Sequence, residues 1–253
     1  MLLRAENLTK RFGGVLAVQA VDFEVAPGAV HSIIGPNGAG KTTLLNLLSG
    51  VSRADHGRIH LEARELTGCE THEFAAAGIG RTFQNLQIFF NMTAAENVIA
   101  GGWLHQSCSF LSALLRTPGR IRAEREARAA AQALLEFVGL ARWADADADS
   151  LPYGALKRLE VARALAGRPK LLLLDEPAAG LNATETREID ELIRRIAARG
   201  VTVVLVEHNM KLVMEVSQRV LVLHEGRKLA EGEPRAVRED PRVVEAYLGV
   251  EAC

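Results

Sequence analysis

The stretch Gly35-Pro36-Asn37-Gly38-Ala39-Gly40-Lys41-Thr42-Thr43 constrains this chain more than any other feature. It fits the phosphate-binding loop pattern, in which a glycine and four free positions precede Gly-Lys-Ser/Thr. Residues 30–34 predict a buried strand before the loop, and residues 44–48 predict the start of a helix after it. Glycines let backbone N–H groups converge on an anion, and a helix N-terminus adds further donors. This order of strand, loop and helix indicates a nucleotide phosphate site more strongly than an ordinary glycine-rich turn.

Two acidic residues close a second apolar run. Four leucines at 171–174 precede Asp175, Glu176 and a proline, which predicts a strand buried on both faces. Ligands bind at the carboxyl ends of strands in open parallel sheets, so we expect both acids at the phosphate edge. Carboxylates there need cations, which a Mg²⁺–triphosphate supplies. In this pattern Lys41 reaches the β- and γ-phosphates and the Thr42 hydroxyl ligates Mg²⁺. The alternative, a charge pair at a helix N-terminus, fits the following proline less well.

Composition narrows the class of protein. The 253 residues are 48% hydrophobic with a net charge of −1, which suits a globular protein and disfavours nucleic acid as a partner. Charged residues within the first ten positions argue against a signal peptide, and no apolar run approaches the length of a membrane helix. Three scattered cysteines indicate reduced thiols in a cytoplasmic setting. Any membrane association is therefore expected to come through a partner.

The N-terminal half predicts strands followed by helices. Residues 2–8 and 18–25 alternate as half-exposed strands, with Phe12 in a loop between them, either offered to a planar ring or packed in the core. A short strand at 58–61 follows the phosphate loop. From about 85 to 164 the composition favours a mainly helical inserted subdomain, including a helix at 122–138. Residues 103–121 favour a surface helix pair over a membrane-touching segment.

The C-terminal part returns to the α/β pattern. Asn182 and Glu185 resemble a capping pair that opens a helix ended by Gly200. The apolar run at 201–206 predicts a strand that places the following His208 on the same sheet edge as Lys41 and Asp175. A hairpin at 220–230 and a terminal helix at 241–248 complete the chain. We therefore expect one α/β domain over 1–250, with a nucleotide core at about 1–84 and 165–235, the helical subdomain at 85–164, and a helical tail from about 236.

These motifs together resemble one protein family end to end. The quoted segments are 35–43, Gly-Ile-Gly-Arg-Thr-Phe-Gln at 78–84, Glu-Pro-Ala-Ala-Gly-Leu-Asn at 176–182, Glu-His-Asn-Met-Lys-Leu-Val-Met at 207–214 and Ala-Tyr-Leu-Gly at 246–249. They look like the ATP-binding subunit of an ABC transporter, and in particular like an ATPase of branched-chain amino acid importers. The resemblance implies a P-loop NTPase core of the ABC ATPase type, with an N-terminal antiparallel β region and the inserted helical subdomain.

The resemblance also implies roles for single residues. Phe12 matches the aromatic residue that stacks on adenine. Gln84 matches the glutamine that contacts Mg²⁺ and senses the membrane subunit, and Asp175 matches an acid that holds Mg²⁺. Glu176 matches the general base that polarises the attacking water, and His208 matches the switch histidine at the γ-phosphate. Positive charge, an in-line water and a base are what phosphoryl transfer requires, so the set is chemically consistent.

In this family two ATPases meet head to tail, and the signature segment of one caps the ATP of the other. The corresponding residues here are Leu151, Pro152, Tyr153, Gly154 and Ala155, where the common signature is Leu-Ser-Gly-Gly-Gln. Pro152 offers neither a hydroxyl nor an N–H, and Ala155 lacks the amide. We expect the site capped by this segment to be weakened, and the two sites of a heterodimer to be unequal. The loop that crosses to the dimer partner matches Ala179, Gly180, Leu181 and Asn182.

The resemblance implies ATP and Mg²⁺ as cofactors and three kinds of partner. These are a second ATPase, two membrane permease subunits and, indirectly, a periplasmic binding protein, which places the chain at the cytoplasmic face of the inner membrane. A different function that fits the same motifs is a nucleotide-gated assembly subunit that hydrolyses little, because of Pro152 and Ala155. An ATPase that drives transport of urea or amides, aromatic acids or lipopolysaccharide also fits them.

Overall fold

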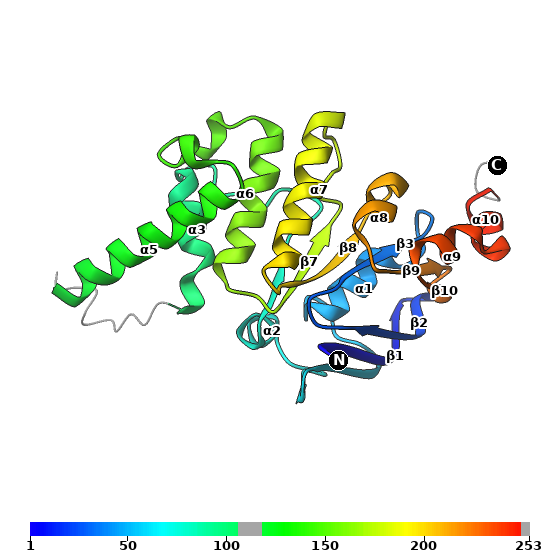
Figure 1. Ribbon diagram of the computed structural model, residues 1–253. Coiled ribbons are helices and arrows are strands. Elements are labelled where there is room, and N and C mark those ends of the chain that lie inside the picture. Colours follow the sequence, from blue (N-terminus) through cyan, green and yellow to red (C-terminus); the bar gives the residue numbers. More distant parts are fainter. Residues whose placement is uncertain (106–117, 249–253) are drawn as a thin grey trace. The chain divides into compact units, whose positions relative to one another are not determined.

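The structure is a computed structural model that describes residues 1–105 and 118–248 (Figure 1). The chain forms two compact units, one of Met1–Arg81 with Lys170–Cys253 and one of Thr82–Pro169. The sequence predicted the corresponding boundaries near residues 84 and 165. Each unit is described below by itself.

A six-stranded sheet forms the centre of the first unit, in the order β10-β9-β3-β8-β7-β6. The five strands from β9 to β6 run parallel, and β10 pairs antiparallel with β9. Every residue of β3, β7 and β8 is buried, as expected for parallel strands covered on both faces. The strands are β3 (Val30–Ile34), β6 (Ile79–Arg81), β7 (Leu171–Asp175), β8 (Thr202–Val206), β9 (Arg219–His224) and β10 (Arg227–Gly232).

A four-stranded antiparallel sheet, in the order β2-β1-β4-β5, is the second layer of this unit. It consists of β1 (Leu3–Phe12), β2 (Val15–Val25), β4 (His56–Leu61) and β5 (Arg64–Glu65). Phe12 was expected in a loop, and this was wrong: it ends β1, and only Gly13 and Gly14 form the turn. Register shifts along β1 after Ala5, Leu8 and Lys10 interrupt the two-residue alternation, which is why the pattern predicted an earlier strand end.

The main hydrophobic core of this unit includes residues of both sheets and of the helix that follows the phosphate loop. Phe23 on β2 and Leu44, Leu45, Leu47 and Leu48 on α1 are fully buried in it. Burying five such side chains contributes on the order of 10 kcal/mol, which anchors α1 firmly. The helices of the unit are α1 (Lys41–Leu48), α2 (Thr71–Ala77), α7 (Ala183–Ala198), α8 (Met210–Val216), α9 (Pro234–Glu239) and α10 (Pro241–Leu248).

The second unit is mainly helical, as predicted. Its α-helices are α3 (Ala94–Gly101), α5 (Pro118–Phe137) and α6 (Tyr153–Ala166), and its short 3₁₀ helices are η1 (Trp103–His105), η2 (Ala141–Trp143) and η3 (Ala148–Ser150). The predicted helix at 122–138 corresponds to α5. The predicted surface helix pair at 103–121 lies largely outside the described residues. Among the described helices of both units, none combines the length and apolarity that a membrane crossing requires.

Candidate functional site

The phosphate-binding loop joins β3, in the middle of the sheet, to α1. Its glycines are required by close backbone approaches: a Cβ on Gly35 would lie 2.2 Å from the carbonyl oxygen of Leu223, and one on Gly40 would lie 2.3 Å from that of Ala17. Gly40 precedes α1 with φ of 98° and supplies no side-chain cap. The first N–H groups of α1 therefore have no side-chain acceptor, which suits an anion.

Lys41 is folded over the loop that precedes it. Its ammonium group donates to the carbonyl oxygens of Gly35 at 2.8 Å and Pro36 at 3.0 Å. The residue is only 6% exposed. Burial lowers the pKa of Lys41, whereas the carboxylates of Glu176 and Asp175 act in the opposite direction. The structure thus places the predicted lysine and both predicted acids within electrostatic reach of one another.

Asp175 and Glu176 lie at the carboxyl end of β7, beside the end of β8. The Glu176 N–H donates to the carbonyl oxygen of Val206 at 2.9 Å. Glu176 has φ of 48°, a conformation that costs a non-glycine residue about 1 kcal/mol or more. The Nε2 atom of His208, just after β8, lies 2.9 Å from Oε1 of Glu176. A carboxylate and a histidine are therefore held in contact at the edge where the phosphate loop begins.

Glu207 organises the backbone around this pair, a role that the sequence did not suggest. The residue is 4% exposed, and its carboxylate accepts hydrogen bonds from the Ala178 N–H at 2.9 Å and the His208 N–H at 3.1 Å. Burial raises the pKa of Glu207, and these hydrogen bonds oppose the increase. Glu207 thereby ties the turn after β7 to the turn after β8. In the sequence, the available sign of this role was an acidic residue directly after the largely apolar run at 201–206.

Arg81, at the end of β6, is a second residue whose role was not predicted. Its Nη2 atom lies 3.3 Å from Oδ2 of Asp175, and its Nη1 atom donates to the Ser49 hydroxyl at 2.7 Å. Ser49 ends α1, so this arginine connects the phosphate-loop helix with the acid of β7. Two buried charges in such a geometry stabilise one another only as a pair.

The remaining predicted site residues of this unit are Phe12, at the end of β1, and the segment 179–182, before α7. Phe12 is 51% exposed, which rules out the alternative that it packs in the core, and the Lys10 ammonium lies 5.5 Å from its ring centroid. Residues 179–182 lead from the Glu176 turn into α7. The Asn182 side chain accepts the Thr184 N–H at 2.9 Å and the Glu185 N–H at 3.0 Å, which confirms the predicted helix cap.

The helical unit carries Gln84 and the signature residues. Gln84 is exposed, and its backbone carbonyl oxygen accepts a hydrogen bond from the Lys157 ammonium at 3.3 Å. Pro152 is the N-cap of α6, where it provides no side-chain cap; Leu151, Gly154 and Ala155 are buried, and Tyr153 is 46% exposed. The N-terminal N–H groups of α6 consequently lack a side-chain cap. Contact of Gln84 with a metal and capping of a partner's ATP stay predictions.

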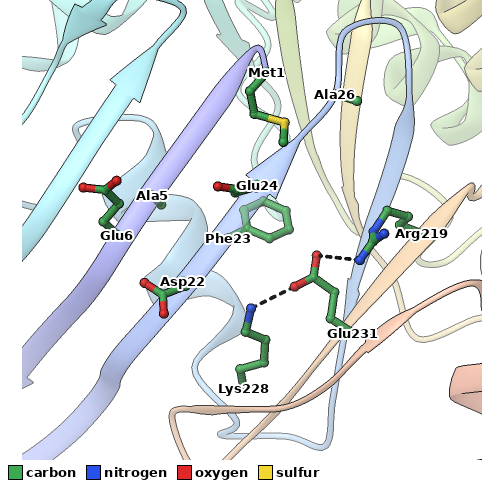
Figure 2. Close-up of a pocket in the computed structure, with 10 residues that line it drawn as sticks. All are labelled: Met1, Ala5, Glu6, Asp22, Phe23, Glu24, Ala26, Arg219, Lys228 and Glu231. Carbon is green, nitrogen blue, oxygen red and sulfur yellow. Dashed lines mark hydrogen bonds and ion pairs between the residues drawn. The ribbon is translucent and has the colours of Figure 1, made fainter.

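A separate cavity of about 490 Å³ lies between β2 and the β9–β10 hairpin (Figure 2). Glu231 lies 2.8 Å from Lys228 and 3.6 Å from Arg219, so the charges on this wall are mutually paired. The buried His31 ring lies 3.5 Å from the same carboxylate, and burial lowers the pKa of His31 to about 4. None of the residues lining this cavity belongs to the candidate nucleotide site. These three pairs of Glu231 all lie within the six-stranded sheet, between β3, β9 and β10.

A phosphate-binding loop after a central parallel strand, with acids at the end of a nearby strand, defines a P-loop nucleotide-binding protein. Comparison with known proteins identifies the family. The model described as ABC transporter matches residues 18–179, and a second one, described as branched-chain amino acid ATP-binding cassette transporter, matches residues 227–253. This chain belongs to the ABC transporter family.

Three curated relatives align over almost their whole length. BraF of Pseudomonas aeruginosa and LivG of Escherichia coli, both high-affinity branched-chain amino acid transport ATP-binding proteins, are 45% and 44% identical over 249 residues, with 98% of each chain covered. LptB of Acidithiobacillus ferridurans, a lipopolysaccharide export system ATP-binding protein, is 38% identical over 98% of this chain and 97% of its own.

Solved structures agree with this fold. An ATP-binding cassette of an ABC transporter in its ADP conformation superposes with a TM-score of 0.85, at 36% identity and 98% coverage of both chains. A dimeric bacterial ABC transporter cassette gives a TM-score of 0.79 at 25% identity, covering 92% of this chain and 99% of its own. These likenesses confirm the predicted fold class, including the antiparallel N-terminal sheet and the helical insert.

Proposed function

We propose that this chain is the Mg²⁺-dependent ATPase subunit of a bacterial importer for branched-chain amino acids, bound to the cytoplasmic face of the inner membrane through its permease. The observation that carries the proposal is the contact of Glu176 with His208, at 2.9 Å, at the sheet edge where the buried Lys41 begins α1. Hydrolysis of a nucleoside triphosphate needs a carboxylate that acts as a base on the attacking water, and beside it a side chain that donates a hydrogen bond to the γ-phosphate.

In this proposal the phosphate groups lie against the loop 35–43 and the N-terminus of α1. Lys41 leaves the Gly35 and Pro36 carbonyls and donates to the β- and γ-phosphates. Glu176 takes a proton from the attacking water, and His208 orients Glu176 and donates to the γ-phosphate. Phe12 is exposed at the end of β1, where its face is available to the adenine ring.

The residues present fit a magnesium ion. The Thr42 hydroxyl and the Asp175 carboxylate are hard oxygen donors, the ligand type that Mg²⁺ prefers. Within the described part of the chain, no group of three or more histidine, cysteine or acidic side chains could hold a metal by itself. That suits an ion that takes most of its ligands from water and phosphate. When bound, Mg²⁺ would neutralise charge on the phosphate oxygens, and Gln84 is proposed as a further contact.

In a dimer, the signature segment of the second subunit would cover the γ-phosphate of the ATP bound to this chain. The signature residues 151–155 belong to the helical unit and begin α6, whose N-terminus presents backbone donors. We propose that they cap the ATP of a second, different ATPase subunit, whose own signature caps the ATP of this chain. Two permease subunits and a periplasmic binding protein complete the working transporter.

The transported substrate is proposed from the relatives that carry branched-chain amino acids. Uptake into proteoliposomes holding this chain, its partner ATPase, the permeases and the binding protein tests it. We expect ATP-dependent uptake of leucine, isoleucine and valine, without competition from urea, amides or aromatic acids. Uptake of one of those competitors alone, or stimulation of ATPase activity by lipopolysaccharide, would contradict the substrate assignment. ATP that stays bound without phosphate release would favour the weakly hydrolysing assembly subunit.

A further inference from the structure

Polar side chains of α6 hold the segment that carries Gln84. Within the helical unit, the Lys157 ammonium donates to the backbone carbonyl oxygen of Gln84 at 3.3 Å. The Phe83 N–H donates to Oε1 of Glu160 at 3.1 Å. Two neighbouring residues of this segment are thus fixed through their backbones by side chains of one helix.

Both α6 residues carry their charges in a buried position. Lys157 is 2% exposed and Glu160 is 3% exposed, and they lie three positions apart, on the same face of the helix. Burial raises the pKa of Glu160, whereas the hydrogen bond from Phe83 and the charge of Lys157 oppose this increase. Burying a charged group is costly, and an apolar side chain would fill the same space without that cost. Packing alone therefore does not account for a lysine at this position.

The same lysine also contacts the signature segment. Its ammonium lies 5.8 Å from the ring centroid of Tyr153, one turn earlier on α6, which is within the range of a cation–π interaction. Residues at this spacing share one face of a helix, so Tyr153, Lys157 and Glu160 form a stripe along α6. The ring and the carboxylate together stabilise the ammonium in the position from which it reaches Gln84.

We propose that Lys157 is a positioning residue for ATP hydrolysis, whose ammonium, held on α6 beside Tyr153, fixes the backbone of Gln84 and with it the direction of the Gln84 side chain. The inference rests on the proposed function, in which Gln84 contacts Mg²⁺. A residue that orients a metal ligand acts through that ligand, and its loss usually costs about 10- to 100-fold in metal affinity or activity.

Lys157→Met tests this, because it keeps an unbranched side chain and removes the charge and the hydrogen-bond donors. In the isolated full-length protein without nucleotide, hydrogen exchange over residues 83–86 should become faster, while exchange over residues 35–43 stays unchanged. In the assembled transporter, phosphate release should slow by roughly 10-fold or more. Lys211→Met, which replaces a lysine whose side chain is 84% exposed, is the control and should change none of these quantities.

A double substitution separates positioning from packing. If Lys157 acts through Gln84, Lys157→Met should add no further slowing to that of Gln84→Ala. Slowing that multiplies in the double variant, or exchange over residues 83–86 that stays at the parent rate in Lys157→Met, would refute the positioning role. Glu160→Gln, which removes the neighbouring charge, should show the same dependence on Gln84, and it carries the test if Lys157→Met does not fold.

Gln84→Ala alone distinguishes the two levels of the proposal. If Gln84→Ala slows phosphate release and Lys157→Met does not, only the role of Lys157 is refuted. If Gln84→Ala releases phosphate at the parent rate, the proposed metal contact is wrong and the role of Lys157 falls with it. A parent transporter that hydrolyses no ATP would refute the proposed function itself.

Discussion

The guanidinium of Arg81 lies 3.3 Å from the Oδ2 atom of Asp175, with the two side chains only 6% and 2% exposed. Asp175 is the acid proposed to hold Mg²⁺, and Arg81 also bonds Ser49 at the end of α1. Arg81 is therefore a counter-charge built into the fold for an acid that, in the proposed function, meets a second cation only when nucleotide is bound. Such a pair costs little while it is intact and much when one member is removed.

We expect Arg81→Met to reduce the free energy of unfolding by about 3–5 kcal/mol, because it removes the arginine member of a buried ion pair and keeps the carboxylate buried. Saturating Mg·ADP should recover part of that loss, since the ion supplies positive charge at the same carboxylate. Urea unfolding with and without Mg·ADP measures both effects. Arg53→Met, which removes an exposed ion pair with Glu70, is the control and should cost less than about 1 kcal/mol. Equal losses in the two variants would show that the Arg81 pair is not buried.

His31 gives the stability of the protein a pH dependence. Burial lowers its pKa from 6.5 to about 4 in the folded state. The unfolded chain therefore takes up a proton at higher pH than the folded one, and stability is lost as pH falls from 6.5 towards 4. The groups that face the ring are Glu231, which raises this pKa, and Arg219 and Lys228, which lower it.

The expected size of this effect is about 2 kcal/mol between pH 7.5 and pH 5, at about 1.36 kcal/mol per pKa unit. The measurement is the free energy of unfolding of the parent protein and of His31→Gln at both pH values. The parent should lose about 2 kcal/mol more than the variant. Parallel losses would show that His31 keeps an ordinary pKa when folded.

Pro152 begins α6 without a side-chain cap and without a hydroxyl for a phosphate. We expect Pro152→Ser to lower the ATP concentration needed to half-saturate hydrolysis in the assembled transporter, by up to about tenfold, because one hydrogen bond to a charged group is gained. ATP titration of phosphate release measures it. Ser150→Ala, two residues earlier and outside the signature, should leave the titration unchanged.

Unequal sites follow from the same departure from the common signature. In the proposed heterodimer, the signature of the other ATPase caps the ATP of this chain, whereas the segment with Pro152 and Ala155 caps the ATP of that partner. Glu176→Gln, which replaces the proposed base of this chain, should therefore slow transport more than the equivalent replacement in the partner. Transport rates of the two singly substituted complexes decide the matter, and equal slowing would refute the asymmetry.

Local patterns were sufficient to predict the parts of the site that lie within single stretches of sequence. The glycine-rich loop, the acids after an apolar strand and the Asn182 cap each have a signature only a few residues long. The parallel arrangement of β7 and β8 then brings His208 to Glu176, because strands that end at the same edge carry their following residues together.

Contacts between distant stretches could not be predicted in this way. Arg81 ends a strand of three residues, too short for any periodicity, and meets an acid 94 positions later. The prediction for Phe12 failed because register shifts along β1 interrupt the alternation from which the end of the strand was predicted.

The central claim is that Glu176 is the base for ATP hydrolysis at this phosphate loop. Its most direct test is single-turnover phosphate release by the assembled transporter carrying Glu176→Gln, with the Kd for ATP measured in parallel. We predict release slowed by roughly 100-fold or more, the usual contribution of a general base, while the Kd stays within about threefold of the parent value. Phosphate release at the parent rate from this variant would contradict the claim.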